Sequence, residues 1–232
     1  MCTVSYVPLG PGNFILTSNR DENPQRVTLE PGKSTTLVEA ETIIAPKDTK
    51  AGGSWIAMSA HGKVACLLNG AFVKHQHEPP YRKSRGLVLL DYFSFSTAIE
   101  YHNKADLQGI ENFTLLMLEN GMLYELRWDG QEKFFAMKEE DEPHLWSSCT
   151  LYDAETASNK EQKFLHWMED HEKPTAAELA FFHGLNNPDG FLLELPMVKT
   201  VSITTVHKTA ADIRMDYYDL LTAHNVEKTV RF

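Results

Sequence analysis

The stretch that decides the fold is MCTVSYVPLGPGNFILTSNRDE, residues 1–22. Residues 3–8 are half apolar and residues 13–18 are again rich in β-forming side chains, while Gly10-Pro11-Gly12 between them is a strong turn signal. The two segments are predicted to pair as an antiparallel hairpin. Because such a hairpin brings the start of one strand beside the end of the other, both ends of the quoted stretch are expected to meet.

The remainder of the chain alternates groups of strands with pairs of helices. Further strands are expected over residues 43–45, 54–59, 63–68, 113–118, 123–128, 133–137, 201–207 and 213–217. Helices are expected within 83–103, broken near Ser94 to Ser96 with Ser96 as an N-cap, over 155–171, and from Pro174 to about 185. Residues 23–42 are expected to be irregular. Since hairpins outnumber crossovers, we predict mostly antiparallel sheets covered by helical layers.

Length and composition indicate one domain over residues 1–232, because no Pro/Ser/Gly-rich linker interrupts the chain. The net charge of -10 argues against a nucleic-acid partner or a general anionic membrane surface, but leaves a small-molecule substrate or ligand open. Three cysteines are too few for a disulfide scaffold. No apolar run reaches the roughly 18 residues of a membrane span, and the N-terminus lacks signal-peptide character. We therefore expect a cytoplasmic protein.

The chemistry that the predicted hairpin supports begins at Cys2. If Met1 is removed, Cys2 carries both a thiol and a free α-amino group, whose reference pKa of about 7.7–8.0 allows it to act as a base. A nearby guanidinium favours the thiolate, and Arg20 is the candidate. Asp21 is the candidate for orienting the amine, and Asn69, at the end of an apolar strand, for donating to an oxyanion.

Each of these features has a simpler explanation when it is taken alone. Most cysteines at position two are incidental, and the tetrad Asn19-Arg20-Asp21-Glu22 would usually be a solvated strand end with weak ion pairs. Asn69-Gly70 alone indicates a turn, and Gly52-Gly53 alone indicates a backbone requirement. Only their combination favours a single site.

The combination resembles a known family. The motifs are Met1-Cys2, Asn19-Arg20-Asp21-Glu22, Gly52-Gly53-Ser54-Trp55, Leu68-Asn69 and Ser84-Arg85-Gly86-Leu87. They occur in the order and approximate spacing of the NRDE family, which includes the Transport and Golgi Organisation 2-like proteins. The resemblance covers the first ninety or so residues well and the remainder weakly. The family is similar in turn to the cysteine N-terminal nucleophile hydrolases.

This resemblance implies an α+β fold, a four-layer αββα sandwich of the N-terminal nucleophile hydrolase type. It implies that Cys2 is nucleophile and base, with Arg20 and Asp21 as polar neighbours and Asn69 as an oxyanion donor. The function expected is hydrolysis of a linear carbon-nitrogen amide through a thioester on Cys2. The alternative is a non-catalytic binding or carrier protein of the same family that handles haem or acylated small molecules.

The second half of the chain departs from the family pattern at two places. Trp146-Ser147-Ser148-Cys149 stands where the resemblance implies a Leu-Ser-Asn segment, so the second asparagine of the hydrolase site is either replaced by Ser148 or absent. Lys199 stands where many relatives carry an arginine, and a lysine lacks the bidentate fork of a guanidinium. We expect Asn19, Trp55, Ser148 and Lys199 to bind substrate.

The remaining polar and aromatic residues predict no further site. His75-x-His77 lacks an evident third ligand, so it is interpreted as a solvated histidine pair rather than a metal site. Cys66 alternates with Val64 and Leu68 in a strand, and we expect its thiol to be buried and inert. We expect no metal and no cofactor, and nothing in the apolar pattern predicts the oligomeric state.

Overall fold

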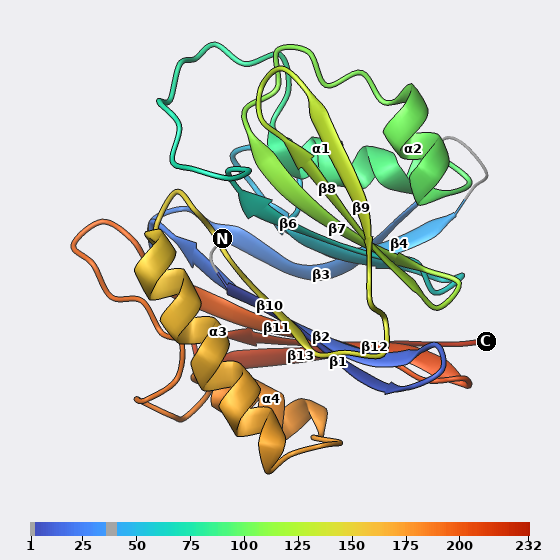
Figure 1. Ribbon diagram of the computed structural model, residues 1–232, viewed down its shortest axis with the longest axis vertical. Helices are drawn as coiled ribbons and strands as arrows, with labels where there is room; N and C mark the ends of the chain where they lie inside the picture. Colours follow the sequence, from blue (N-terminus) through green and yellow to red (C-terminus); the bar gives the residue numbers. More distant parts are fainter. Residues whose placement is uncertain (1–2, 36–40) are drawn as a thin grey trace.

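The computed structural model describes residues 3–35 and 41–232, which form two antiparallel sheets packed face to face (Figure 1). The first sheet has the order β10-β1-β2-β11-β12-β13. Its strands are β1 (Thr3–Gly10), β2 (Asn13–Glu22), β10 (His144–Ser147), β11 (Lys199–Lys208), β12 (Asp212–Asp219) and β13 (His224–Arg231).

The second sheet has the order β3-β4-β5-β6-β7-β8-β9, in which each strand follows its neighbour along the chain. Its strands are β3 (Thr28–Thr35), β4 (Thr42–Asp48), β5 (Ile56–Ser59), β6 (Val64–Asn69), β7 (Phe113–Glu119), β8 (Met122–Trp128) and β9 (Lys133–Lys138). Short turns join β5 to β6, β7 to β8 and β8 to β9, which is why hairpin signals predicted these pairs, whereas residues 70–112 separate β6 from β7.

Helices cover the outer face of each sheet (Figure 1). The helices α1 (Arg85–Asp91) and α2 (Ala98–Lys104), with the short 3-10 turn η1 (Tyr92–Ser94) between them, pack on the second sheet. The helices α3 (Ala154–Glu169) and α4 (Ala176–Phe182) pack on the first sheet. The order of layers is therefore helix, sheet, sheet, helix, and the predicted four-layer αββα sandwich is confirmed.

Three apolar clusters hold the layers together. The cluster between the sheets contains Val4 and Leu16 from the first sheet and Cys66 from the second. A second cluster lies under α1 and α2, and a third lies under α3 and α4 around Phe164. Because successive side chains of a strand point to opposite faces, even-numbered residues of β1 and β2 enter the first cluster and odd-numbered residues enter the third.

The predicted N-terminal hairpin is present. Its strands β1 and β2 pair from Gly10 and Asn13 to Thr3 and Asn19. Gly10 and Gly12 take positive φ angles of 115° and 70°, a conformation that glycine adopts without the Cβ clash of other residues. The turn signal in the sequence therefore has the local physical cause that was expected.

The expectation of irregular structure over residues 23–42 is wrong, because β3 crosses that segment. Pro31 is tolerated since β3 is an edge strand, where a missing N–H need not break a ladder, and the register shifts between Leu29 and Gly32. The strands β10 and β13 were not predicted either. β10 has only four residues, and β13 alternates between exposed and half-buried positions, so neither shows a marked apolar pattern.

Two helix starts differ from the prediction, by one residue at the N-cap of α2 and by two residues at the first residue of α4. Thr97, rather than Ser96, caps α2 and accepts a hydrogen bond from the Glu100 amide. Thr175, rather than Pro174, precedes α4 and forms a reciprocal capping box with Glu178. Across residues 3–35 and 41–232, the structure contains no helix that combines the length and the apolar character required to cross a membrane.

Candidate active site

The end of β2 presents its charged residues to two different layers. Arg20 shares the face of Leu16, which lies between the sheets, whereas Asp21 shares the face of Ile15, which lies under α3 and α4. Both side chains are buried, at 2% and 3% exposure. The expected site is thus divided by the strand itself, since adjacent residues cannot project to the same side.

Arg20 is held by a set of contacts between the sheets. Its Nη2 lies 2.9 Å from Oδ2 of Asp48, its Nη1 donates to the Thr28 hydroxyl, and its guanidinium carbon lies 4.3 Å from the ring centre of Trp55. Burial lowers the pKa of Arg20, and the Asp48 carboxylate opposes this shift. The positive charge of Arg20 is therefore largely compensated by Asp48.

Asp48 organises the segment that follows β4. Its Oδ2 also lies 2.6 Å from Nε of Arg26, and its Oδ1 accepts the backbone N–H groups of Lys50 and Ala51 at 3.0 Å and 2.9 Å. The carboxylate thus pairs with two arginines and closes the turn that leads into Gly52-Gly53. Sequence reasoning did not single out Asp48, because its partners come from a different strand.

The glycines of the two quoted motifs have a packing role. A Cβ on Gly53 would lie 2.3 Å from the carbonyl carbon of Gly86, and a Cβ on Gly86 would lie 2.8 Å from the carbonyl oxygen of Ser54. The Ser54 amide donates to the Gly86 carbonyl at 3.1 Å. The backbone requirement predicted for Gly52-Gly53 is confirmed, because only residues without a side chain allow this approach of α1 to the sheet.

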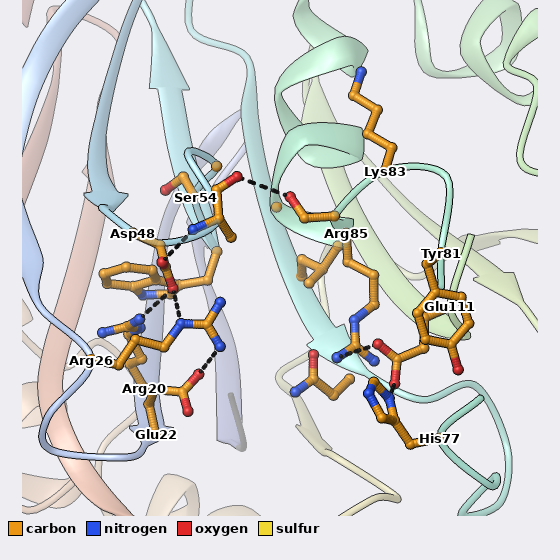
Figure 2. A pocket seen from close by; sticks show the side chains of 17 residues that line it. Arg20, Glu22, Arg26, Asp48, Ser54, His77, Tyr81, Lys83, Arg85 and Glu111 are labelled. Carbon is orange, nitrogen blue, oxygen red and sulfur yellow. Dashed lines mark hydrogen bonds and ion pairs between the residues drawn. The ribbon is translucent and has the colours of Figure 1, made fainter. Parts of the chain in front are cut away.

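A cavity of about 430 Å³ lies beside Arg20. It is lined by Arg20, Glu22, Arg26, Asp48, Ala51, Gly53, Ser54, Trp55, Leu67, Asn69, His77, Tyr81, Lys83, Ser84, Arg85, Gly86 and Glu111. Figure 2 shows Arg20, Arg26, Asp48 and Glu22 on one side, facing Arg85, Glu111, His77 and Tyr81 on the other. Three predicted site residues, Arg20, Trp55 and Asn69, thus border one space.

Glu111 holds the second wall of this cavity together. Its Oε2 lies 3.0 Å from Nη2 of Arg85, and its Oε1 lies 2.9 Å from Nδ1 of His77 and 3.2 Å from Nε2 of His75. The Arg85 guanidinium, His77 and His75 lower the pKa of Glu111 against the effect of burial. The histidine pair is therefore not simply solvated, since the His75 side chain is only 14% exposed. In the part of the chain that the structure describes, no group of three His, Cys, Asp or Glu side chains is placed to hold a metal.

Asn69 lines this cavity, and Ser148, which does not line it, contacts the Asn69 backbone. The Ser148 hydroxyl donates to the Asn69 carbonyl at 2.7 Å and lies 2.9 Å from the Thr150 hydroxyl. Ser148 is 1% exposed, and the two hydrogen bonds of its hydroxyl are both made to protein atoms. Among residues 3–35 and 41–232, nothing hydrogen-bonds to the Asn69 carboxamide, which leaves this group available to a ligand in the cavity.

Asp21 lies on the other face of β2 and joins three segments. Its carboxylate accepts from the Thr200 hydroxyl of β11 at 2.5 Å and from the Tyr152 hydroxyl at 3.3 Å. Lys160 of α3 lies over the Tyr152 ring at 3.8 Å and donates to the Thr3 hydroxyl. Sequence reasoning missed Tyr152 and Lys160, because they come from a turn and a helix far from the hairpin.

Asn19 is fully buried and belongs to a polar chain through His183. Its Nδ2 donates to the carbonyls of His183 and Phe191 at 3.0 Å and 2.7 Å, so that its Oδ1 accepts from Nδ1 of His183 at 2.8 Å. The Nε2 of His183 then accepts from the Ser5 hydroxyl at 2.7 Å. Burial, with a contribution from Lys160, lowers the pKa of His183 to about 3, so the ring is neutral.

The other predicted residues lie as follows. Lys199 begins β11, where it pairs in register with Glu22 and forms an isolated bridge with Glu194, and it does not line the 430 Å³ cavity.

Cys66 is completely buried, and burial raises the pKa of its thiol to about 12, which agrees with the expected inert thiol. Cys2 lies outside the described residues. The next residue, Thr3, pairs with Asn19 on one side and Ser147 on the other.

A family model for Transport and Golgi organisation 2 matches residues 1–212. The chain belongs to the Transport and Golgi organisation 2 family. The match covers most of the 232 residues, and therefore includes the polar clusters of β2 as well as α3 and α4. No curated protein matches the sequence.

The chain is similar in fold to solved structures. Two variants of conjugated bile acid hydrolase from Clostridium perfringens, an arginine-to-leucine variant and a cysteine-to-alanine mutant, superpose with TM-scores of 0.57 and 0.54. Each hydrolase sequence is 11% identical to this chain, and each alignment covers 100% of this chain and 97% of the hydrolase. The similarity places this family member among proteins of the N-terminal nucleophile hydrolase fold.

Proposed function

We propose that the protein is a cysteine amidohydrolase that cleaves a linear carbon-nitrogen amide through a thioester on Cys2. The observation that carries the proposal is the position of Thr3. It pairs with Asn19 at the end of β2, and its hydroxyl accepts from Lys160. The described start of β1 therefore lies beside the buried polar residues at the end of β2.

The proposed reaction starts with transfer of the Cys2 thiol proton to the α-amino group that removal of Met1 exposes. The thiolate forms a bond to the amide carbon, and the resulting oxyanion accepts hydrogen bonds from the Asn69 carboxamide and a backbone N–H. The carbon-nitrogen bond breaks as the protonated α-amine returns its proton to the leaving nitrogen. Water then hydrolyses the thioester and restores the thiol.

Two cavities offer room for a small-molecule substrate. The lining of the 430 Å³ cavity includes three arginines and three acidic residues, and Asn69 also lines it. A second cavity, of about 760 Å³, is lined in part by Ala71 and by Ser147, which pairs with Thr3. Its lining includes Phe72 and Val73, which are 50% and 74% exposed. We assign the part of the substrate that carries the scissile amide to the first cavity, which Asn69 lines.

A carrier without turnover is the second candidate function, and the ion pair of Arg20 favours it. Because Asp48 compensates the Arg20 charge at 2.9 Å, this guanidinium does little to stabilise a thiolate at Cys2. A small-molecule carrier needs the cavities and no activated thiol. The thiol reactivity of Cys2 therefore distinguishes the two functions.

The decisive experiment uses full-length protein expressed without an N-terminal tag. Intact mass spectrometry is expected to show loss of Met1, and site-resolved iodoacetamide labelling is expected to modify Cys2 much faster than Cys149 or the buried Cys66. Turnover of a panel of acyl amides should then be detected by release of the amine, and Cys2→Ala should abolish it. Retention of Met1, or equal labelling of all the thiols, would rule out the hydrolase and leave the carrier.

A further inference from the structure

The strand β9 forms an edge of the second sheet and lacks the protection that the edge strands β3, β10 and β13 have. An unpaired edge can pair with another chain, and proteins usually prevent this with short strands, proline or charged side chains. The strand β10 has four residues, β3 contains Pro31 and a register shift, and the exposed positions of β13 are all polar. In contrast, β9 has six residues without proline, and its four central residues, 134–137, are apolar.

Apolar side chains are exposed on both faces of β9. Phe134 is 42% exposed and Met137 is 60% exposed, and they lie on opposite faces because strand residues alternate. The Phe72 ring packs edge-on against the Phe134 ring with 4.9 Å between the ring centres. Phe72 is itself 50% exposed, and the next residue, Val73, is 74% exposed. Contiguous exposed apolar side chains of this kind mark an interaction surface.

In the described part of the chain, the outer backbone edge of β9 is open. The strand pairs with β8 from Lys133 opposite Trp128 to Lys138 opposite Leu123. Among the described residues, no backbone–backbone hydrogen bond outside this ladder involves residues 133–138. Every second residue of an antiparallel strand directs its N–H and C=O groups away from the existing partner. These groups of β9 can therefore receive one more strand.

The charges at the two ends of β9 are complementary when the strand meets a copy of itself. Glu132 and Lys138 are each three residues from Phe135, and both share the face of Phe134. In an antiparallel pair centred on Phe135, Glu132 of each copy lies opposite Lys138 of the other. Phe134 of each copy lies opposite Ala136, which is exposed. Opposite charges and apolar side chains across two strands both stabilise such a pair.

The second lysine of the strand does not oppose this pairing. Lys133 Nζ donates to the carbonyls of His102 and Ala105 at 2.6 Å and 2.5 Å, so its charge is directed toward the end of α2. A register centred one residue further along the chain would place Glu132 of one copy opposite Glu140 of the other, and like charges across two strands are unfavourable. The charges thus favour the register centred on Phe135.

We propose that β9 is a dimerisation strand, which pairs antiparallel with β9 of a second copy of this chain about a two-fold axis at Phe135. The second sheets of both copies then form one continuous sheet, with an ion pair between Glu132 and Lys138 at each end of the contact. A two-fold contact of this kind is self-complementary, as closed dimers require. The inference does not depend on the proposed hydrolase or carrier function, because the contact uses no residue that lines the 430 Å³ cavity.

The test measures the mass of the full-length protein in solution by sedimentation velocity at increasing concentration. The parent protein should dimerise reversibly. Glu132→Lys and Lys138→Glu each replace two ion pairs by two like-charge contacts, so each variant alone should raise the Kd of the dimer at least about tenfold. An equimolar mixture of these two variants should dimerise as the parent protein does, because both contacts of the mixed dimer join opposite charges. Native mass spectrometry with one variant isotope-labelled identifies the mixed dimer.

Glu139→Lys is the matched control, because it changes the net charge by the same amount as Glu132→Lys. Glu139 is exposed and follows the last paired residue, so its replacement should leave the Kd unchanged. Both positions are exposed, and unfolding midpoints verify that each variant is folded. An equal loss in Glu132→Lys and Glu139→Lys would overturn the proposed register. A mixture that dimerises no better than its components would overturn the two-fold pairing. A parent protein that stays monomeric up to about 1 mM would overturn the dimer and leave this edge to a strand of another protein.

Discussion

Replacing Asp48 by Asn should destabilise the protein strongly, because it leaves a buried arginine without its counter-ion. The Arg20 side chain is 3% exposed and that of Asp48 is 10% exposed, and their charged atoms lie 2.9 Å apart. Removing one partner of a buried ion pair costs about 3–5 kcal/mol. The asparagine can still accept the Lys50 and Ala51 amides through its oxygen, but its NH₂ group then faces two guanidinium groups.

The expected loss corresponds to a large shift in the melting temperature. Scaling the typical unfolding entropy to 232 residues gives about 0.5 kcal/mol per kelvin, so Tm should fall by roughly 6–10 °C. Urea unfolding followed by tryptophan fluorescence is a suitable measurement, because Trp55 stacks on the Arg20 guanidinium. Circular dichroism on the same samples checks that both probes report one transition.

Glu22→Gln is the control for this measurement. Glu22 pairs with Arg26 at 3.0 Å, but the two side chains are 27% and 32% exposed, so the loss should stay within about 1 kcal/mol. The double variant Arg20→Met/Asp48→Asn should be more stable than the sum of the two single losses predicts, since the unpaired charge is removed. A loss in Asp48→Asn no greater than that in Glu22→Gln would refute the reasoning, as would strict additivity.

Three further predictions concern the packing and titration of the fold. Phe164→Ala should lower the free energy of unfolding in urea by about 3–5 kcal/mol, because the ring is fully buried. Leu165→Ala should lower it by less than about 1 kcal/mol, because Leu165 is 42% exposed. Equal losses would contradict the packing of α3. Gly53→Ala should lower the urea midpoint well beyond Gly32→Ala, since a Cβ would meet backbone at 2.3 Å in the first case and 4.0 Å in the second. His183 has a pKa of about 3 in the folded protein, below the unfolded value of 6.5, so the unfolded state binds more protons between these values. The contribution of His183 to the free energy of unfolding is therefore complete above pH 6.5. It falls as the pH drops, by up to about 1.4 kcal/mol per pH unit. When unfolding is measured at about pH 7.5 and about pH 5, the His183→Gln variant should lack this pH-dependent component.

Local signals in the sequence predicted the elements whose structure is set by neighbouring residues. The glycines of the first turn have positive φ angles, and the Asn120-Gly121 pair joins β7 to β8 in the same way. Each of these turns depends on backbone conformations that glycine and asparagine adopt at low cost. The edge strands β3 and β13 carry weaker signals, because their stability comes from pairing with a neighbour rather than from their own apolar pattern.

The sequence by itself determined the hairpin, the alternation of its faces, the order of the helices and of the strands with a marked apolar pattern, and the motifs of the family. The sequence analysis expected Arg20 and Asp21 in one site, but the side chains of a strand alternate, and the structure places the two on opposite faces of β2. Only the tertiary structure decided their partners. Asp48 and Glu111 meet arginines distant in the sequence, and α3 brings Lys160 to Thr3 across 157 positions. Such pairs depend on how whole layers pack, and a local pattern carries no record of that packing.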